Sequence, residues 1–145
     1  MAIESTGVYP VYKNQFQVGA TKDTATGIAD MESFSISIDN GVEEWSPFDQ
    51  EGWVRRLQTA KSITISVSGK RNVGDTGNDF VADKAFKNGR DVEGYFAWVF
   101  PDGTTVSWDM AIYSVNECGA GDSTAVAPLS FDLMSNGKPV ITMAS

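Results

Sequence analysis

Two segments of this chain, residues 32–40 and 61–70, alternate strictly between apolar and small polar residues. The apolar positions in them are Phe34, Ile36, Ile38, Ile63, Ile65 and Val67. A period of two indicates a half-buried strand, because successive side chains of a strand point to opposite faces of the sheet. One apolar and one solvated face is typical of antiparallel sheets. The sequence therefore predicts two antiparallel strands whose solvated face is rich in Ser and Thr.

Further strands are predicted towards the C-terminus. Residues 93–100 and 104–117 flank the turn signal Pro101-Asp102-Gly103 and together indicate a hairpin. Alternation returns around Phe131 and is followed by Asn136-Gly137, the strongest short-range hairpin signal. Residues 138–143 would then form the last strand, with Pro139 placing it at a sheet edge or at its own start. Residues 12–19 are expected to add one more strand.

One helix is expected within this β pattern, over about residues 78–88. Asp75 or Asn78 can cap its start, and Gly89 can close it in a left-handed conformation. The side chains expected to share its apolar side are Phe80, Val81, Ala85 and Phe86. A helix of about three turns is too short to be stable alone, so we expect it to lie on the sheet. The chain is therefore predicted to be a mainly β (α+β) protein with one flanking helix.

The connection between the two alternating strands, residues 40–60, is read as a long loop rich in aromatic and acidic side chains. The large and charged side chains that it carries are Glu43, Glu44, Trp45, Phe48, Asp49, Glu51, Trp53, Arg55 and Arg56. Long loops in compact domains are usually functional. Exposure to water does not stabilise a tryptophan side chain. We therefore expect these two tryptophans to pack against either the domain's own core or a second chain.

Composition narrows the class of protein. A chain of 145 residues is expected to form one domain over residues 1–145. Its 19 Asp and Glu against 11 Lys and Arg argue against a stable nucleic-acid complex, although DNA can pass an acidic surface without sticking to it. No apolar run reaches the roughly 20 residues of a membrane span. The first ten residues do not read as a secretory signal, and the single Cys118 suits folding in a reducing cytoplasm.

The residue types and their spacing give little support for an enzymatic or metal-binding function. The chain has no histidine, which removes the commonest general base and the His-containing triads. Asp109, Glu117 and Asp132 are the carboxylates that a hydrolase would need, but solvated strand positions account for them better. The acidic stretch 75–79 lacks the remaining ligand positions of a calcium loop, and a helix cap explains it better. We therefore expect no catalytic residue, no cofactor and no metal.

Tryptophan content leaves a second function class open. Trp98 and Trp108 stand in phase with other large apolar residues and are expected in the core. Trp45 and Trp53 remain candidates for an exposed platform on which sugar rings stack. The alternative function is therefore a carbohydrate-binding β-sandwich module.

Several ordered blocks of the sequence resemble one known family. These blocks are EEWSPFDQEGWVRRLQTAKSITISVSGKR at 43–71, GDTGNDFVADK at 74–84, YFAWVFPDGTTVSWDMAIYS at 95–114 and APLSFDLMSNGKP at 127–139. Together they resemble the major tail tube proteins of long-tailed, siphovirus-type bacteriophages. Ala60 departs from a glycine expected in that family, which puts a local turn in doubt.

The resemblance implies a fold, an assembly and a set of partners. It implies an antiparallel β-sandwich or barrel with a flanking helix and a long inter-strand loop. Six copies would form a ring, and stacked rings would form a hollow virion tail tube, assembled in the bacterial host cytoplasm. The tape-measure protein and the genomic DNA would pass through its lumen, and the DNA would be in transit during ejection.

In this expectation residues 40–60 are the assembly arm between rings. The interface residues that we predict there are Glu43, Glu44, Trp45, Phe48, Trp53, Arg55 and Arg56. The Ser- and Thr-rich strand faces around Ile36 and Ile65 are candidates for the lumen wall. The family carries no catalytic residues.

Overall fold

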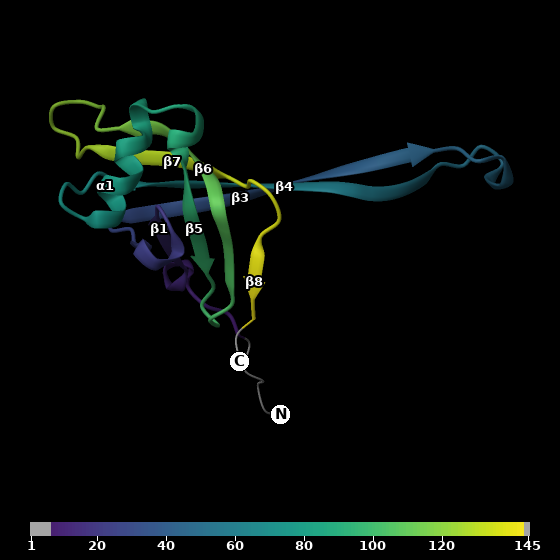
Figure 1. Ribbon diagram of the computed structural model, residues 1–145, viewed down its shortest axis with the longest axis horizontal. Helices are drawn as coiled ribbons and strands as arrows, with labels where there is room; N and C mark the ends of the chain where they lie inside the picture. The colour runs from purple at the N-terminus through teal and green to yellow at the C-terminus, as the bar shows by residue number, and fades with distance from the viewer. Residues whose placement is uncertain (1–6, 144–145) are drawn as a thin grey trace.

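Eight antiparallel strands form one sheet in the computed structural model, which describes residues 7–143 (Figure 1). The strands are β1 (Gln15–Gly19), β2 (Thr26–Gly27), β3 (Met31–Trp45), β4 (Arg55–Lys70), β5 (Glu93–Val99), β6 (Thr105–Cys118), β7 (Pro128–Met134) and β8 (Val140–Thr142). Their order in the sheet is β2-β1-β5-β6-β7-β4-β3, and β8 pairs with β6. The mainly β prediction is confirmed. Most of the N-terminal stretch compared above with a secretory signal lies outside the described residues.

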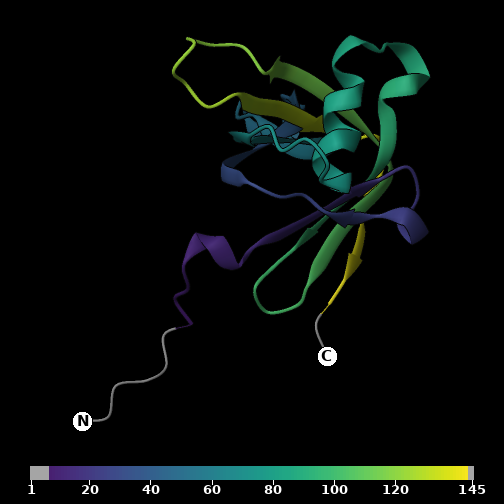
Figure 2. The ribbon, with the colours of Figure 1, turned by 90° about the vertical axis from the view of Figure 1, so that its left-hand side faces the viewer.

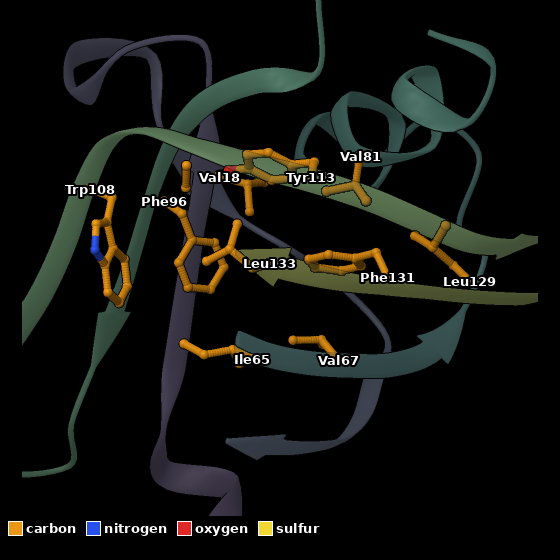
Figure 3. Close-up of a cluster of buried hydrophobic side chains, with 11 residues drawn as sticks. Val18, Ile65, Val67, Val81, Phe96, Trp108, Tyr113, Leu129, Phe131 and Leu133 are labelled. Carbon is orange, nitrogen blue, oxygen red and sulfur yellow. The ribbon is translucent and has the colours of Figure 1, made fainter. Parts of the chain in front are cut away.

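The sheet curls so that its two ends face each other. Phe16 of β1 and Phe34 of β3 contact edge to face, with ring centroids 4.9 Å apart, although these strands share no hydrogen bonds. The fully buried core lies inside this curl, and its largest side chains include Phe96, Tyr113 and Phe131 (Figure 3). The structure is therefore an open, curled sheet. It has the curvature of the predicted sandwich or barrel, but the two ends of the sheet do not join.

The hairpin predicted around residues 101–103 is present between β5 and β6. Gly103 adopts φ 98°, and its N–H donates to the Phe100 carbonyl at 2.9 Å. The Asp102 carboxylate accepts a hydrogen bond from the Thr104 N–H at 2.9 Å. Proline, aspartate and glycine thus occupy the positions for which their backbone preferences suit them.

The hairpin predicted at Asn136-Gly137 is wrong. β8 begins directly after Pro139, as expected, but it pairs with β6 through Thr105↔Thr142 and Ser107↔Val140. Both edges of β7 are already occupied, by β4 on one side and β6 on the other, so β7 has no edge left for β8. The Asn136 side chain instead donates to the Met110 carbonyl at 3.0 Å and ties the connection to β6.

The helix is shorter than predicted and begins earlier. α1 spans Thr76–Ala82, and a 3-10 turn over Asp83–Phe86 follows it. Because a 3-10 turn has three residues per turn instead of 3.6, it moves the later side chains off the apolar side. Val81 is accordingly buried, whereas Phe86 is 99% exposed, so its predicted place on the sheet is wrong. Gly89 has positive φ but starts a separate 3-10 turn, Gly89–Val92.

Polar side chains fix the start of α1 to the sheet. The Asp75 carboxylate caps the helix by accepting from the Asn78 N–H at 3.0 Å, and it also accepts from the Ala29 N–H at 3.1 Å. The buried Asn78 amide donates to the carbonyls of Ala29 and Lys70. It accepts from the Arg71 guanidinium and the Asn72 N–H. The stretch 75–79 is therefore a helix cap.

The N-terminal strand is also shorter than predicted. Within the predicted segment 12–19, β1 covers only Gln15–Gly19, and a 3-10 turn over Val11–Lys13 precedes it. Figures 1 and 2 show the segment before β1 at the end of the body away from α1, where Tyr9 and Lys13 line a hollow together with Pro101 of the β5–β6 turn.

Candidate assembly interface

The strands β3 and β4 extend far beyond the rest of the sheet as a two-stranded arm (Figure 1). β7 pairs with β4 only over Thr64–Lys70, so the part of β4 before these residues has β3 as its neighbour. We define the arm as residues 39–62, which start at the pair Asp39↔Ser62. All of these residues are exposed except Pro47, which is half-buried.

The predicted loop over residues 40–60 is therefore mostly strand. β3 continues to Trp45 and β4 resumes at Arg55, which leaves residues 46–54 as the connection. Apolar-polar alternation disappears here because both faces of the arm meet solvent, so the sequence pattern gave no strand signal. Cross-strand side-chain pairs stabilise the register instead. These pairs include the ion pair of Arg56 and Glu44 at 2.7 Å and the hydrogen bond from Gln58 to Asn40 at 3.1 Å.

An irregularity in the register divides the arm. Gly41 pairs with Ala60 and Val42 pairs with Gln58, which leaves Thr59 as an extra residue in β4. A Cβ on Gly41 would lie 2.8 Å from the Cβ of Ala60, so the close approach requires glycine at position 41. Position 60, where the resemblance implied a glycine, carries the small side chain of Ala60, which lies directly opposite Gly41.

We call the part of the arm beyond the bulge, residues 42–58, the outer arm. The bulge determines which of its side chains share a face. One face continues the core-facing side of the sheet. It carries Val42, Glu44, Arg56 and Gln58. The opposite face carries Trp45, Arg55 and Leu57, and the Arg55 guanidinium lies 6.0 Å from the ring centroid of Trp45. The outer arm thus presents two chemically different surfaces to its surroundings.

The tip of the arm carries the most exposed aromatic side chains of this hairpin. Phe48 is 106% exposed and Trp53 is 77% exposed, whereas Trp45 at the end of β3 is 44% exposed. A 3-10 turn over Phe48–Gln50 and the positive φ angles of Glu51 and Gly52 shape the connection. The aromatic side chains of the tip do not pack against the core of their own subunit.

All seven predicted interface residues lie on the outer part of the arm. The structure brings Glu44 to Arg56 and Trp45 to Arg55, and it places Glu43 opposite Leu57. Their role in assembly remains a prediction. Sequence reasoning missed Val42, Val54 and Leu57, which are 46%, 44% and 60% exposed and add apolar area to the arm.

Of the three carboxylates considered for hydrolysis, Asp109 and Asp132 lie far apart, and Glu117 is exposed near the end of β6, opposite Ser130. The Asp132 carboxylate accepts a hydrogen bond from Ser66 at 2.7 Å on the outer face of the sheet. Asp109 lies five residues along β6 from Ser114, which is opposite Asp132, a separation of roughly 16 Å at about 3.3 Å per residue. Within residues 7–143, no group of three or more His, Cys, Asp or Glu side chains is placed to hold a metal ion. No helix in that range is long and apolar enough to cross a bilayer.

Trp98 and Trp108 lie at the core as expected, whereas Trp45 and Trp53, for which the sequence left several surroundings open, are exposed. Trp108 is 2% exposed, and Trp98 packs against the core while its ring N–H donates to Asn14 at 3.0 Å. Trp45 and Trp53 are the exposed pair, and Arg55 lies over the ring of Trp45.

Comparison with known proteins gives matches at the level of the fold. No family model matches the chain, and no curated protein matches its sequence. A chain in the tail of an empty gene transfer agent particle, refined helically with C6 symmetry, is 21% identical with a TM-score of 0.74. The match covers 94% of this chain and 100% of that chain. A chain of the native gene transfer agent virion is 20% identical with a TM-score of 0.73, over the same shares of both chains.

A third match comes from a different kind of assembly. A chain in the extended sheath-tube complex of an extracellular contractile injection system is 16% identical with a TM-score of 0.64, over 94% of this chain and 92% of that chain. These neighbours include both gene transfer agent tails and contractile systems, so they do not single out siphovirus tubes. The chain therefore has the fold of proteins found in phage-like tails and injection tubes.

Proposed function

We propose that this chain is a structural subunit of a phage-like tail tube, and that it forms rings of six that stack into a hollow conduit in a virion tail. The observation that carries the proposal is the solvent-exposed arm with its aromatic tip, on a fold shared with chains of tail assemblies. The C6 symmetry of the gene transfer agent tail supports six copies per ring. A structural role is also consistent with residues 7–143, where the side chains form no evident metal site and Asp109 lies far from Asp132.

The arm needs neighbours in order to be stable. An isolated two-stranded hairpin is at best marginally stable in water. The outer arm has solvent on both faces and buries none of its side chains within the subunit. Contacts with other copies would cover its apolar side chains. Interface energy concentrates in Trp, Tyr and Arg residues of this kind, which makes Trp45, Trp53, Arg55 and Arg56 the strongest anchor candidates.

The outer face of the sheet fits the wall of a conduit. The Ser and Thr side chains predicted on two strands continue onto neighbouring strands, because Ser66 lies opposite Asp132 of β7 and Asp132 lies opposite Ser114 of β6. The Ser33 and Ser68 hydroxyls hydrogen-bond across β3 and β4 at 2.7 Å on the same face. We assign this small, polar surface to the lumen, where genomic DNA and the tape-measure protein would pass.

The acidic net charge of the chain supports passage of DNA through the tube without stable binding. The chain has a net charge of −8, and six copies would make each ring strongly acidic. Screening over about 8 Å confines the repulsion to the region near the wall. Replacing Ser35, Ser66 and Ser114 together by Lys should leave tubes intact and slow genome delivery, measured as DNA release from particles with time. Unchanged release would remove this face from the lumen.

The whole proposal is tested by assembly of the purified chain. Negative-stain micrographs at rising protein concentration should show tubes, while sedimentation shows species larger than a monomer. The control is a variant in which residues 40–61 are replaced by an Asn-Gly turn, which keeps the core and removes the arm. This variant should stay a folded monomer. A wild-type chain that stays monomeric and shifts its tryptophan fluorescence with oligosaccharides would favour the carbohydrate-binding alternative.

A further inference from the structure

Three Asn-Gly dipeptides occur in this chain, at residues 40–41, 88–89 and 136–137. In such a dipeptide the backbone nitrogen of the glycine can attack the side-chain amide carbon of the asparagine, because glycine has no Cβ to hinder the approach. The five-membered ring that forms then opens to aspartate or isoaspartate, and this reaction makes asparagine one of the thermolabile residues of proteins. The dipeptide is the same at all three sites, so in the folded chain the surroundings of each site decide how fast it reacts.

The site at Asn88 already holds the two reacting groups in contact. Asn88 and Gly89 are exposed and lie in the connection between α1 and β5 (Figure 2). The Gly89 N–H donates to the side-chain oxygen of Asn88 at 2.9 Å. Because a C=O bond is about 1.23 Å long, the Asn88 Cγ lies within about 4.1 Å of the same nitrogen. Contact of this kind between a nucleophile and its target raises the rate of an intramolecular reaction.

The other two sites hold their amides against neighbouring strands. The Asn40 side-chain oxygen accepts from Gln58 at 3.1 Å, and residues 40 and 41 both pair with residues of β4. The Asn136 side-chain nitrogen donates to the Met110 carbonyl of β6 at 3.0 Å. At either site the amide must give up its partner on another strand before its carbon can turn towards the nitrogen of the next glycine.

We propose that Asn88 is a site of spontaneous deamidation and that, in the folded chain, it reacts faster than Asn40 and Asn136. The contacts of the three side chains carry the proposal, because the Asn88 amide touches the nitrogen that attacks it and the other two amides are bonded elsewhere. The reaction takes place within one subunit. The proposal therefore goes beyond the proposed tube function and does not rest on it.

The atoms of the reaction balance with water as the one co-reactant. The Gly89 nitrogen loses its proton to solvent and bonds to the Asn88 Cγ, while the bond from Cγ to Nδ2 breaks and the side-chain nitrogen leaves as ammonia. Water then opens the ring. Attack at Cγ gives aspartate, and attack at the backbone carbonyl carbon of residue 88 gives isoaspartate, in which the main chain runs through Cγ. One water is consumed and one ammonia is released for each site that reacts.

Deamidation at this site would change the surface on the far side of the sheet from the assigned lumen. α1, which leads into the connection, packs on the core side of the sheet, where the Phe80 ring lies 5.5 Å from that of Tyr113. Each converted copy gains one negative charge, so an assembled ring would become more acidic with time. The arm and the Ser- and Thr-rich face keep their side chains. The converted fraction therefore records the age of a particle without altering its conduit.

Mass spectrometry of the incubated protein tests the site directly. The purified chain is kept at mildly alkaline pH, and samples are taken over several weeks. Chymotrypsin cleaves after aromatic residues and releases the three sites in separate peptides, 35–45, 87–95 and 132–145. Each conversion adds about 1 Da to its peptide. Conversion of Asn88 should be at least tenfold faster than that of Asn40 or Asn136, and equal rates at the three sites would overturn the proposal.

Unfolding the chain provides the matched control. In concentrated guanidinium chloride the three dipeptides lose their tertiary contacts, so their rates should become similar. If Asn88 kept its tenfold advantage in the unfolded chain, the selectivity would belong to the local sequence and the inference from the folded contacts would fail.

A variant at the same position isolates the ring closure. Asn88→Gln keeps the amide but adds one methylene, so attack by the next nitrogen would need a six-membered ring, which forms far more slowly. Peptide 87–95 of this variant should stay unmodified, while the other two peptides react as in the wild type. Circular dichroism and Tm should match the wild type. Equal conversion in the variant would place the reacting amide elsewhere in the peptide.

The outcomes keep this proposal separate from the tube function. Tubes that form from a chain whose three sites react equally would leave the tube function standing and remove the modification site. A chain that never forms tubes but converts Asn88 selectively would do the reverse.

Discussion

The body and the arm share the strands β3 and β4 but differ in what covers these strands. Ile65 and Val67 of β4 are fully buried beneath the curl of the sheet. Ile38 belongs to the same apolar stripe on β3 and is 48% exposed, because β3 runs beyond the strands that would face it. The comparison shows that alternation determines which side chains share a face of the sheet. Whether that face is buried depends on how far the strands on the opposite side of the curl extend.

The two regions also differ in how their polar groups are used. In the body, Asn78 is completely buried and both ends of its amide are hydrogen-bonded to the backbone. In the arm, polar side chains pair across the strands in full contact with solvent, as in Glu44 with Arg56. Contacts inside the core therefore determine the structure of the body, whereas the side chains of the arm contact solvent and the opposite strand of the hairpin.

The largest effect should come from the body. Phe131→Ala removes a fully buried ring and should lower the free energy of unfolding by about 3–5 kcal/mol. Ile38→Ala, at the half-exposed position next to the arm, should change it by only about 0.5 kcal/mol in the monomer. Urea denaturation followed by circular dichroism measures both. Similar losses for the two variants would show that Ile38 is covered within one subunit.

The next effect should appear only in assembly. Trp53→Ala and Trp45→Ala should each leave Tm unchanged and weaken the contact between copies by about 2 kcal/mol or more, which is about thirtyfold. Sedimentation and negative-stain microscopy over a concentration series measure the loss of tubes. Phe86→Ala is the control, because Phe86 is 99% exposed, more than either tryptophan, but lies outside the arm. Unimpaired tubes in both tryptophan variants would remove these residues from the interface.

A smaller effect is expected at the helix cap. Asp75→Ala removes the acceptor of the Asn78 and Ala29 N–H groups and should lower the free energy of unfolding by about 1 kcal/mol. Asp49→Ala, in the short turn at the tip, should leave monomer stability unchanged because Asp49 caps no helix. Thermal unfolding of both variants makes the comparison. A loss for Asp49→Ala as large as that for Asp75→Ala would mean that the tip contributes to monomer folding.

The smallest effect is a dependence of stability on pH. The hydrogen bond from Arg71 lowers the pKa of Asp79 below its ordinary value of 3.8, and the Gly74 N–H adds to this. A lowered pKa in the folded state means that the stabilisation is present above the ordinary pKa and is lost as the pH falls through the folded-state value. Asp79→Asn should therefore reduce the difference in Tm between pH 6 and pH 3. A difference identical to that of the wild type would assign the acid sensitivity to other carboxylates.

Much of the fold could be predicted from the sequence because it depends on local geometry. The period-two segments, the turn at Pro101-Asp102-Gly103 and the cap at Asp75 follow from backbone preferences that a few neighbouring residues express. The place of Trp108 in the core also followed, since it lies in an alternating strand, whereas the sequence left open whether Trp53 packs on the core of its own chain.

The tertiary structure alone decided the features that depend on which edges and faces remain free. β8 pairs with β6 because both edges of β7 are occupied, which no local signal at Asn136-Gly137 can express. The arm is strand instead of loop because its side chains pair across the hairpin in solvent, where alternation carries no information. A cavity lies between β1 and β3 because the curl of the sheet stops short of closure, and strands distant in the chain set that curvature together.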